Sequence, residues 1–286
     1  MNITVTTRPV TDRPIWSATR LKTLLTCPRQ FRYAYVDLIP TPATAPLVFG
    51  RMLHETLCFL HERHMAERQL PPIMEVLQQF DRLWSRALDE ERPLFRKGAP
   101  SPQMHTTIAH EVLRAFLSAQ EKSGPPLLAE LAFEVEAAGH TLCGIIDRVD
   151  EGPDGLIIVD FKSGQRKPPL AEVERDLQLT LYAFAARQVL RQPVERVVYY
   201  HLRDGSQLTA TRDESHFNWL LDTVLPHAVT VLEREQFPPH YGYWCNFCDF
   251  REICRAQNAV EQNAAEQKGK DSGVKGGEEP WPTPPS

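Results

Sequence analysis

Two aspartates and a lysine in the middle of the chain combine the side chains that metal-assisted chemistry on a phosphate requires. Asp160 and Lys162 end the apolar run LIIVDFK, and Asp147 ends the run GIID. Because side chains alternate along a strand, Asp160 and Lys162 are expected on one face and Phe161 on the other. Carboxylates are the hard oxygen ligands that Mg²⁺ and Mn²⁺ prefer. A lysine on the same face could orient an attacking water or neutralise charge that develops on the phosphate.

The same residues have a plainer interpretation, because an Asp at a strand end often serves a turn and D-x-K could be an exposed ion pair worth under about 1 kcal/mol. Three further features favour a site. His54 follows Gly50 by one helical turn, and its neutral imidazole is a candidate third metal ligand. Gln178 and Tyr182 lie four apart, so they share one face of a helix. The loop 163–167 adds small and basic side chains next to these residues.

The elements that must position this set can be read from the apolar pattern. The runs LAELAFEVEA, HTLCGIIDRVD and LIIVDFKSG are separated by polar turns, which predicts a three-stranded meander with Asp147 closing its strand. A helix over about 170–190 should follow, then two strands joined around residues 203–205, and a helix over about 214–236. This order predicts the α/β class, with a central mixed sheet flanked by helices.

The part of the chain before the meander is expected to be helical. Ser17 can cap a helix that runs toward Tyr35. A long helical region should cover about 49–120, with breaks near Pro71–Pro72 and around 93–102. We interpret residues 50–120 as a helical insertion in a single domain that spans 1–257.

Several other polar residues have weaker claims to a site. Glu130, Glu134 and Glu136 lie on the first predicted strand. One of them could extend the metal site, but alternating glutamates on a strand more commonly face solvent. His61 and His64 lie three apart on a polar helix face without an accompanying carboxylate or cysteine, so we expect them at the surface.

Four of the six cysteines form a pattern typical of a metal site. Cys245, Cys248 and Cys254 lie close together near the end, and Cys27 lies 218 residues before the first of them. Four thiolates can hold a zinc ion or a [4Fe–4S] cluster, and the spacing alone leaves both open. Four unrelated reduced thiols are a third interpretation.

The composition, with 42% hydrophobic and 24% charged residues, is ordinary for a globular protein. A net charge of -5 argues against a nucleic-acid partner but does not exclude a local basic cleft.

The sequence contains neither an apolar run long enough to span a membrane nor a secretory signal at its start, which favours the cytoplasm and no membrane partner. It also lacks a Walker loop and a nucleophile elbow. Residues 258–286 are rich in Gln, Gly, Lys, Glu and Pro and are predicted to be a disordered tail.

The order of these motifs resembles a known enzyme family. G-x-x-x-H, then G-I-I-D, V-D-F-K-S-G and Q-x-x-x-Y look like the RecB-type branch of the PD-(D/E)xK nuclease superfamily. The resemblance runs from about Ser17 to Cys254 and implies a restriction-endonuclease-like core. It implies that a Mg²⁺ or Mn²⁺ ion is held by His54, Asp147, Asp160 and the Phe161 carbonyl. It further implies that Lys162 is the catalytic lysine and that Gln178 and Tyr182 position DNA and support the site.

The cysteines take part in the resemblance too. A CPR-like segment at the front with a terminal C-x2-C-x5-C is similar to the iron–sulfur staple of the AddB nuclease domain and of the CRISPR-adaptation exonucleases. By this resemblance, a structural [4Fe–4S] cluster is held by Cys27, Cys245, Cys248 and Cys254. The cluster would tie the N-terminal helix to the C-terminal segment and take no part in hydrolysis.

The expected activity is that of a metal-dependent deoxyribonuclease, an exonuclease on single-stranded DNA or DNA ends, in which metal-activated water hydrolyses phosphodiester bonds. The alternative is a non-catalytic or conditionally catalytic module that clamps a DNA end for a helicase or a CRISPR-adaptation complex. A zinc-stapled binding protein is the third possibility. Among pathways, DNA repair or recombination is favoured slightly over adaptive immunity. Cleavage polarity, oligomeric state and the role of the helical insertion stay open.

Overall fold

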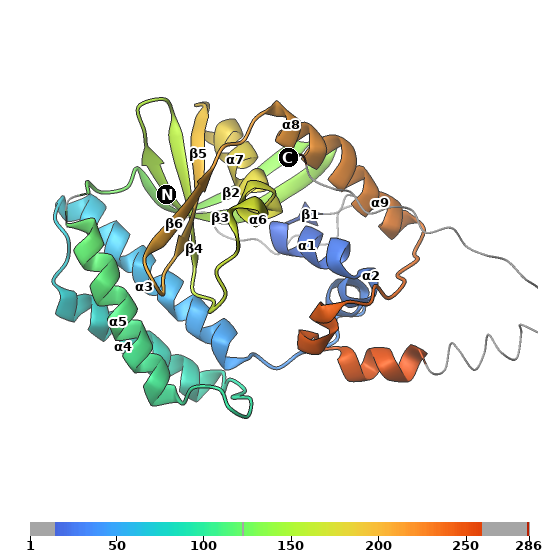
Figure 1. Ribbon diagram of the computed structural model, residues 1–286, viewed down its shortest axis with the longest axis horizontal. Helices are drawn as coiled ribbons and strands as arrows, with labels where there is room; N and C mark the ends of the chain where they lie inside the picture. The colour runs from blue at the N-terminus through green and yellow to red at the C-terminus, as the bar shows by residue number, and fades with distance from the viewer. Residues whose placement is uncertain (1–14, 122, 259–284, 286) are drawn as a thin grey trace, which may run out of the picture. The chain divides into compact units, whose positions relative to one another are not determined.

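The structure is a computed structural model that describes residues 15–121, 123–258 and 285 (Figure 1). The chain divides into two compact units. The larger unit comprises residues 42–136 and 142–217, and the smaller unit comprises the described residues up to 41, residues 137–141 and those from 218 onward. Apart from residues 258 and 285, the predicted tail lies outside the described residues. In the described part of the chain, no helix is long and apolar enough to cross a membrane.

The larger unit is built on a mixed sheet. Strands β3, β4, β5 and β6 lie side by side in that order, and β2 also pairs with β3. The β3–β4 and β5–β6 pairs are antiparallel, whereas β4 and β5 are parallel. These strands confirm the predicted meander and the later strand pair. Their bounds are β2 Leu128–Ala137, β3 His140–Glu151, β4 Leu156–Lys162, β5 Val194–His201 and β6 Ser206–Ala210.

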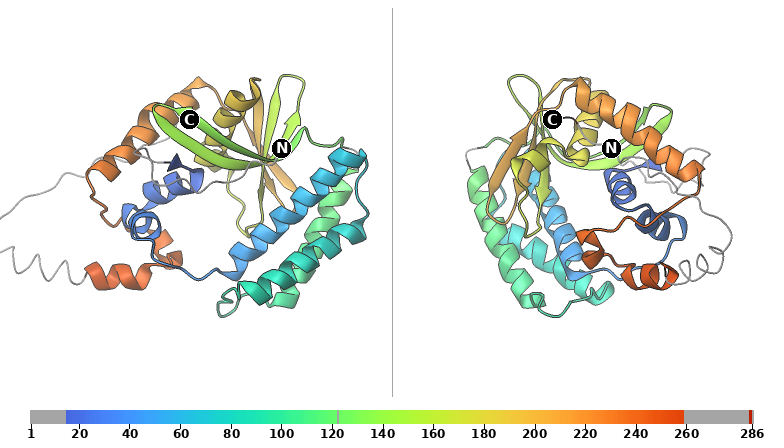
Figure 2. Two further views of the ribbon diagram at one scale, coloured as in Figure 1. Left: turned by 180° about the vertical axis from the view of Figure 1, so that it is seen from behind. Right: turned by 45° about the vertical axis from the view of Figure 1, so that its right-hand side comes forward.

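Three helices form a layer against one face of these strands (Figure 1, Figure 2). They are α3 (Ala45–Glu67), α4 (Ile73–Glu90) and α5 (Pro102–Gln120), and the breaks between them fall at the predicted prolines. The core beneath them includes Phe161 of β4 and Tyr200 of β5. Phe161 therefore points to the helical layer, as its place between Asp160 and Lys162 predicts.

The expectation that His61 and His64 lie at the surface is wrong, because they are 1% and 5% exposed. The ring of His61 stacks on Phe161, and its Nε2 lies 3.3 Å from the Arg148 guanidinium. Burial and the neighbouring Arg148 charge lower the pKa of His61 to about 3, so its ring is neutral. This face of α3 is buried in the core, although its polar residues make it look like a surface face in the sequence.

The connection between the parallel strands β4 and β5 contains two helices, α6 (Leu170–Glu174) and α7 (Leu177–Leu190). The sequence predicts one helix over about 170–190, but the chain breaks at residues 175–176. Asp176 caps α7, because its carboxylate accepts a 2.9 Å hydrogen bond from the backbone N–H of Leu179. Helix α7 packs against β4 and β5, and it carries Gln178 and Tyr182.

In the smaller unit, Ser17 caps the first helix as predicted, with its hydroxyl accepting from the backbone N–H of Arg20. The helix stops at Thr26 because Pro28 disfavours helical backbone at the preceding residue, and Cys27 is extended. The predicted single helix toward Tyr35 is therefore three short pieces. The remaining bounds are β1 Ile15–Trp16, α1 Ala18–Thr26, α2 Pro28–Phe31, π-helical Arg32–Val36 and Trp219–Val224, α8 Glu214–Asn218, α9 Leu225–Glu233, the 3₁₀ turn Tyr243–Phe247 and helical residues 251–258.

Candidate active site

Pairing of β3 with β4 brings the two predicted aspartates to neighbouring strands. Arg148 pairs with Val159, which sets Asp147 next to the position of Asp160. The backbone N–H of Phe161 donates a 2.7 Å hydrogen bond to Asp147 Oδ2. Asp147 does not close its strand as expected, because β3 continues to Glu151. The antiparallel pairing of these two strands, which the predicted meander implies, is nevertheless present.

His54 reaches the same place from α3. Its Nδ1 lies 3.1 Å from Asp147 Oδ1, so both oxygens of this carboxylate have a partner. Burial lowers the pKa of His54, but the hydrogen bond and charge of Asp147 outweigh burial and leave that pKa raised. A divalent cation at Asp147 would compete with this pairing, since a metal ligand must be the neutral imidazole.

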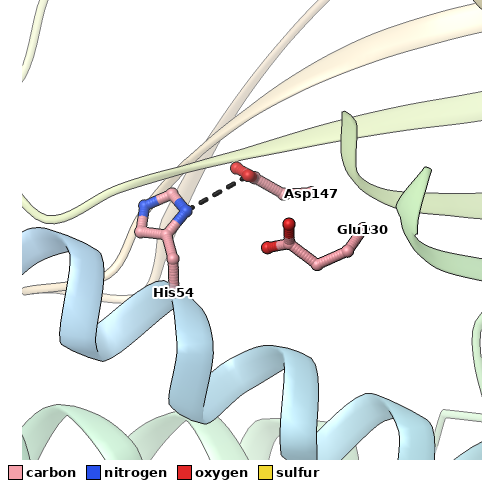
Figure 3. Close-up of side chains that lie close together, drawn as sticks. All are labelled: His54, Glu130 and Asp147. Carbon is pink, nitrogen blue, oxygen red and sulfur yellow. Dashed lines mark hydrogen bonds and ion pairs between the residues drawn. The ribbon is translucent and has the colours of Figure 1, made fainter. Parts of the chain in front are cut away.

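Glu130 of β2 completes a compact group with His54 and Asp147 (Figure 3). One ligand atom of each of the three lies within 4.8 Å of the others. Burial, followed by the charge of Asp147, raises the pKa of the Glu130 carboxyl to about 7. Two carboxylates and an imidazole held this closely are a donor set that fits Mg²⁺ or Mn²⁺, and a cation there would relieve the repulsion that raises this pKa.

Glu130 is the functional candidate that sequence reasoning set aside. Its backbone lies in the left-handed region, with φ of 49°, which is uncommon for a residue with a side chain. This local departure from regular strand geometry coincides with a side chain that faces His54 and Asp147. Simple alternation along β2 cannot identify it, since the alternation rule assumes an unbroken pleat.

Asp160 and Lys162 begin a second chain of contacts beside this group. Lys162 Nζ lies 2.6 Å from Asp160 Oδ2 and donates a 3.0 Å hydrogen bond to Gln178 Oε1. Gln178 Nε2 in turn donates a 2.9 Å hydrogen bond to the Tyr182 hydroxyl. The structure thus connects four of the predicted residues in one path. Asp160 itself is not part of the three-residue group that includes Glu130.

The electrostatics of this path follow from its burial. Asp160 is only 2% exposed, and desolvation raises the pKa of its carboxyl to about 6 although Lys162 lowers it. Burial lowers the pKa of Lys162, but the Asp160 charge outweighs it and raises that pKa to about 12. Burial likewise raises the pKa of Tyr182 to about 12. At neutral pH, Lys162 is therefore a fixed cation and Tyr182 a neutral hydroxyl.

The three-residue group opens into a cleft of about 860 Å³ in the larger unit. Its lining includes Gly50 and His54 of α3 and Ile145 and Asp147 of β3. Ser163, directly after β4, also lines the cleft. A ligand in this cleft could therefore reach the His54, Glu130 and Asp147 side chains from solvent.

A comparison with protein families matches residues 15–255 to the PD-(D/E)XK nuclease superfamily. The chain belongs to this superfamily. The match covers the two predicted aspartates, the lysine and His54, and it contains both units of the structure. Membership of a nuclease superfamily indicates hydrolysis of phosphodiester bonds as the chemistry to consider for this site, which the fold alone would not indicate.

Two solved structures are similar to this member of the nuclease superfamily at low identity. One is SSO0001, with 15% identity over 86% of this chain and 88% of the other, and a TM-score of 0.39. The other is a protein from Eubacterium rectale described as a candidate exonuclease, with 11% identity over 81% and 86% of the chains and a TM-score of 0.49. No curated protein matches the chain.

The four patterned cysteines all belong to the smaller unit, where they line one cavity of about 190 Å³. The backbone N–H of His240 lies 3.4 Å from Cys27 Sγ, and Asn258 Nδ2 lies 3.5 Å from Cys254 Sγ. Burial and the nearby cysteines raise the pKa of the Cys248 and Cys254 thiols. The fold thus brings Cys27 to the cysteines near the other end of the chain.

Proposed function

We propose that the protein is a metal-dependent deoxyribonuclease that hydrolyses phosphodiester bonds. The observation that carries this proposal is the meeting of His54, Glu130 and Asp147 beside the ion pair of Lys162 with the buried Asp160. These groups lie in a member of a nuclease superfamily, and three of them line an open cleft. A structural ion pair alone would need neither the cleft nor the third carboxylate.

In this proposal, His54, Glu130 and Asp147 hold the divalent ion, and Asp160 and the Phe161 carbonyl are the further ligands expected from the family. The ion when bound supplies Lewis-acid chemistry, which polarises the phosphate and lowers the pKa of water. Nothing in the donor set is redox-active, which agrees with hydrolysis.

Lys162 provides the fixed positive charge of the site. Its ammonium group, held by Asp160 and Gln178, orients the attacking water and neutralises charge that develops on the phosphate. Gln178 keeps the lysine in place and is itself held by the Tyr182 hydroxyl. The catalytic contribution of this path is preorganisation, because its members are positioned before the substrate arrives.

The preferred substrate is single-stranded DNA or a DNA end, with exonucleolytic cleavage, and this part of the proposal rests on the family resemblance. The family match spans both units, which supports one nuclease domain over 1–257 with a helical insertion at about 50–120. Repair or recombination of DNA is the proposed setting, with a helicase or a CRISPR-adaptation complex as the kind of partner to look for.

We further propose that the four cysteines hold a structural [4Fe–4S] cluster. All four cysteines line the same cavity, which supports a shared group with four thiolate ligands. The choice of a cluster over a zinc ion rests on the family resemblance.

The test of the nuclease is cleavage of end-labelled single- and double-stranded DNA in Mg²⁺, Mn²⁺ or EDTA. Wild-type protein should cleave only with a divalent ion, and Lys162→Ala should lose cleavage while it still folds. Lys97→Ala, an exposed lysine between α4 and α5, is the matched control and should cleave normally. Absence of cleavage by folded, cluster-loaded wild type would instead favour an accessory module that clamps DNA for a partner.

A further inference from the structure

The loop that follows Lys162 is held by three hydrogen bonds to consecutive carbonyl oxygens. The backbone N–H of Leu202 donates to Lys162 O at 3.0 Å, and Arg203 Nε donates to Ser163 O at 2.9 Å. His201 Nε2 lies 2.9 Å from Gly164 O, where it must carry the proton because a carbonyl oxygen only accepts. The end of β5 therefore fixes the backbone on both sides of Ser163.

We call these three hydrogen bonds to the loop after Lys162 the clamp. Two of the side chains that donate them, His201 and Arg203, are themselves fixed by contacts with other residues. The other ring nitrogen of His201 lies 2.8 Å from Asp204 Oδ1, which fixes the plane of a ring that is only 5% exposed. The Arg203 guanidinium lies over the Phe49 ring at 6.0 Å, so its stem cannot swing freely. A loop supported in this way places the side chain of Ser163 with little freedom.

Gly50 of α3 explains where that side chain goes. A Cβ atom at position 50 would lie 2.8 Å from Ser163 Oγ, closer than such atoms approach in proteins, and 4.0 Å from Ser163 Cβ. The glycine in the G-x-x-x-H motif thus leaves room for one atom, the serine hydroxyl oxygen. Glycine inside a helix is unfavourable relative to alanine, so this packing gives it a reason to be there.

The hydroxyl lies at the right place to meet a substrate. Ser163 lines the same cleft as His54, Glu130 and Asp147. Within the part of the chain that the structure describes, no group hydrogen-bonds with the Ser163 hydroxyl, and the bond to Arg203 uses only its carbonyl. A fixed donor with no protein partner, beside a candidate metal group, is what a phosphate oxygen would accept from.

We propose that the Ser163 hydroxyl donates a hydrogen bond to a phosphate oxygen of the DNA strand in this cleft, and that Gly50 is required because it leaves space for that hydroxyl. The proposal rests on the proposed nuclease function and adds a substrate-contacting residue to it. Gly50 acts only through Ser163 and is a positioning residue. No covalent step is involved.

The first test compares single-turnover cleavage of single-stranded DNA by wild type, Ser163→Ala and Ser85→Ala, the last an exposed serine on α4. A lost hydrogen bond to a charged group should lower the cleavage rate of Ser163→Ala about 10- to 100-fold. Its melting temperature and its affinity for Mn²⁺ should match those of wild type. Ser85→Ala should cleave like wild type.

The second test is a double-mutant cycle with Gly50→Ala, because general damage to α3 would also slow the enzyme. In wild type, Gly50→Ala displaces the hydroxyl and should slow cleavage by a similar factor. In the Ser163→Ala background the added methyl meets no hydroxyl, so it should slow cleavage by less than about twofold. Non-additivity of this kind separates positioning of Ser163 from a general packing defect.

The outcomes distinguish this inference from the function on which it rests. Wild type that does not cleave would overturn both. Cleavage by wild type that is lost in Lys162→Ala, together with a Ser163→Ala rate within about twofold of wild type, would overturn the serine contact alone. Independent, multiplicative effects of Gly50→Ala and Ser163→Ala would overturn the role assigned to Gly50.

Discussion

Asp147 and Phe161 lie fourteen residues apart in the chain, yet the Phe161 backbone N–H donates a 2.7 Å hydrogen bond to Asp147 Oδ2. The other oxygen of the same carboxylate faces His54 at 3.1 Å. Asp147 is thus oriented by one strand and one helix at once. The side chain of Phe161, on the opposite face, packs beneath α3 and its neighbours, so the core and the site share one residue.

Glu130→Gln should weaken the affinity for Mn²⁺ at least about tenfold, because it removes one of the two carboxylates in the compact group. Cleavage should fall in parallel and recover in part at high metal concentration. Isothermal titration with Mn²⁺ measures the first effect and metal-dependent rates measure the second. Glu134→Gln, an exposed glutamate on the same strand, is the control. Equal Mn²⁺ affinity for the two variants would exclude Glu130 as a ligand.

Stability without metal should fall as pH rises from about 6.5 to about 8. The pKa of Glu130 is raised to about 7 and the pKa of His54 is also raised, so the folded protein keeps protons that the unfolded chain has already released. Below about 6.5 the buried His61 acts in the opposite direction, because its pKa of about 3 means that the unfolded chain binds a proton that the folded protein does not. Above that pH the unfolded state binds fewer protons, and the free energy of unfolding decreases with pH. Mg²⁺ replaces those protons, so its effect on the melting temperature should grow over the same range. Thermal melts with and without Mg²⁺ measure both trends. A metal-free melting temperature that rises across the window would contradict this expectation.

Much of the fold is predictable because its signals are local. Alternation identified the meander, proline positions identified the breaks between α3, α4 and α5, and a serine identified the start of α1. The break before α7 was missed because Asp176 caps a helix in the middle of a continuous apolar pattern. The buried histidines of α3 were missed because their partners, Phe161 and Arg148, come from a distant strand.

In the candidate site, too, the residues with a local sequence signal can be predicted and those that depend on distant contacts cannot. Asp147, Asp160 and Lys162 were identifiable because they end or follow apolar runs, and pairing of adjacent strands brings them together. Glu130 depends on an irregular backbone in β2, and no residue type in the sequence signals that geometry. The clamp on the loop after Lys162 depends on residues forty positions later, which a local pattern cannot connect.

The path from Lys162 to Tyr182 should give graded effects on cleavage. Lys162→Ala removes the cation itself and should abolish detectable cleavage. Gln178→Ala removes one hydrogen bond to that cation and should slow cleavage about tenfold. Tyr182→Phe frees the Gln178 amide but leaves its bond to Lys162, so a loss of about two- to fivefold is expected.

Single-turnover rates at saturating metal measure this order. Gln178→Ala and Tyr182→Phe leave every proposed metal ligand and the Lys162 charge in place, so their Mn²⁺ affinity should stay close to that of wild type and serves as the internal control. A Tyr182→Phe variant that is slower than Gln178→Ala would mean that the tyrosine acts directly on DNA rather than through the glutamine.

Anaerobically purified protein should be brown and contain about four iron atoms per chain if the cysteines hold a [4Fe–4S] cluster. Cys248→Ala should be pale and melt at a lower temperature, because the cluster connects Cys27 to the segment around the other three cysteines. Cys143→Ala, a cysteine of β3 that does not line the cavity, should keep both colour and stability. Iron analysis and absorption spectra measure the content, and thermal melts measure the coupling. Zinc in place of iron would contradict the [4Fe–4S] cluster. It would still support a metal-mediated link between Cys27 and the other three cysteines, since four thiolates can bind either group.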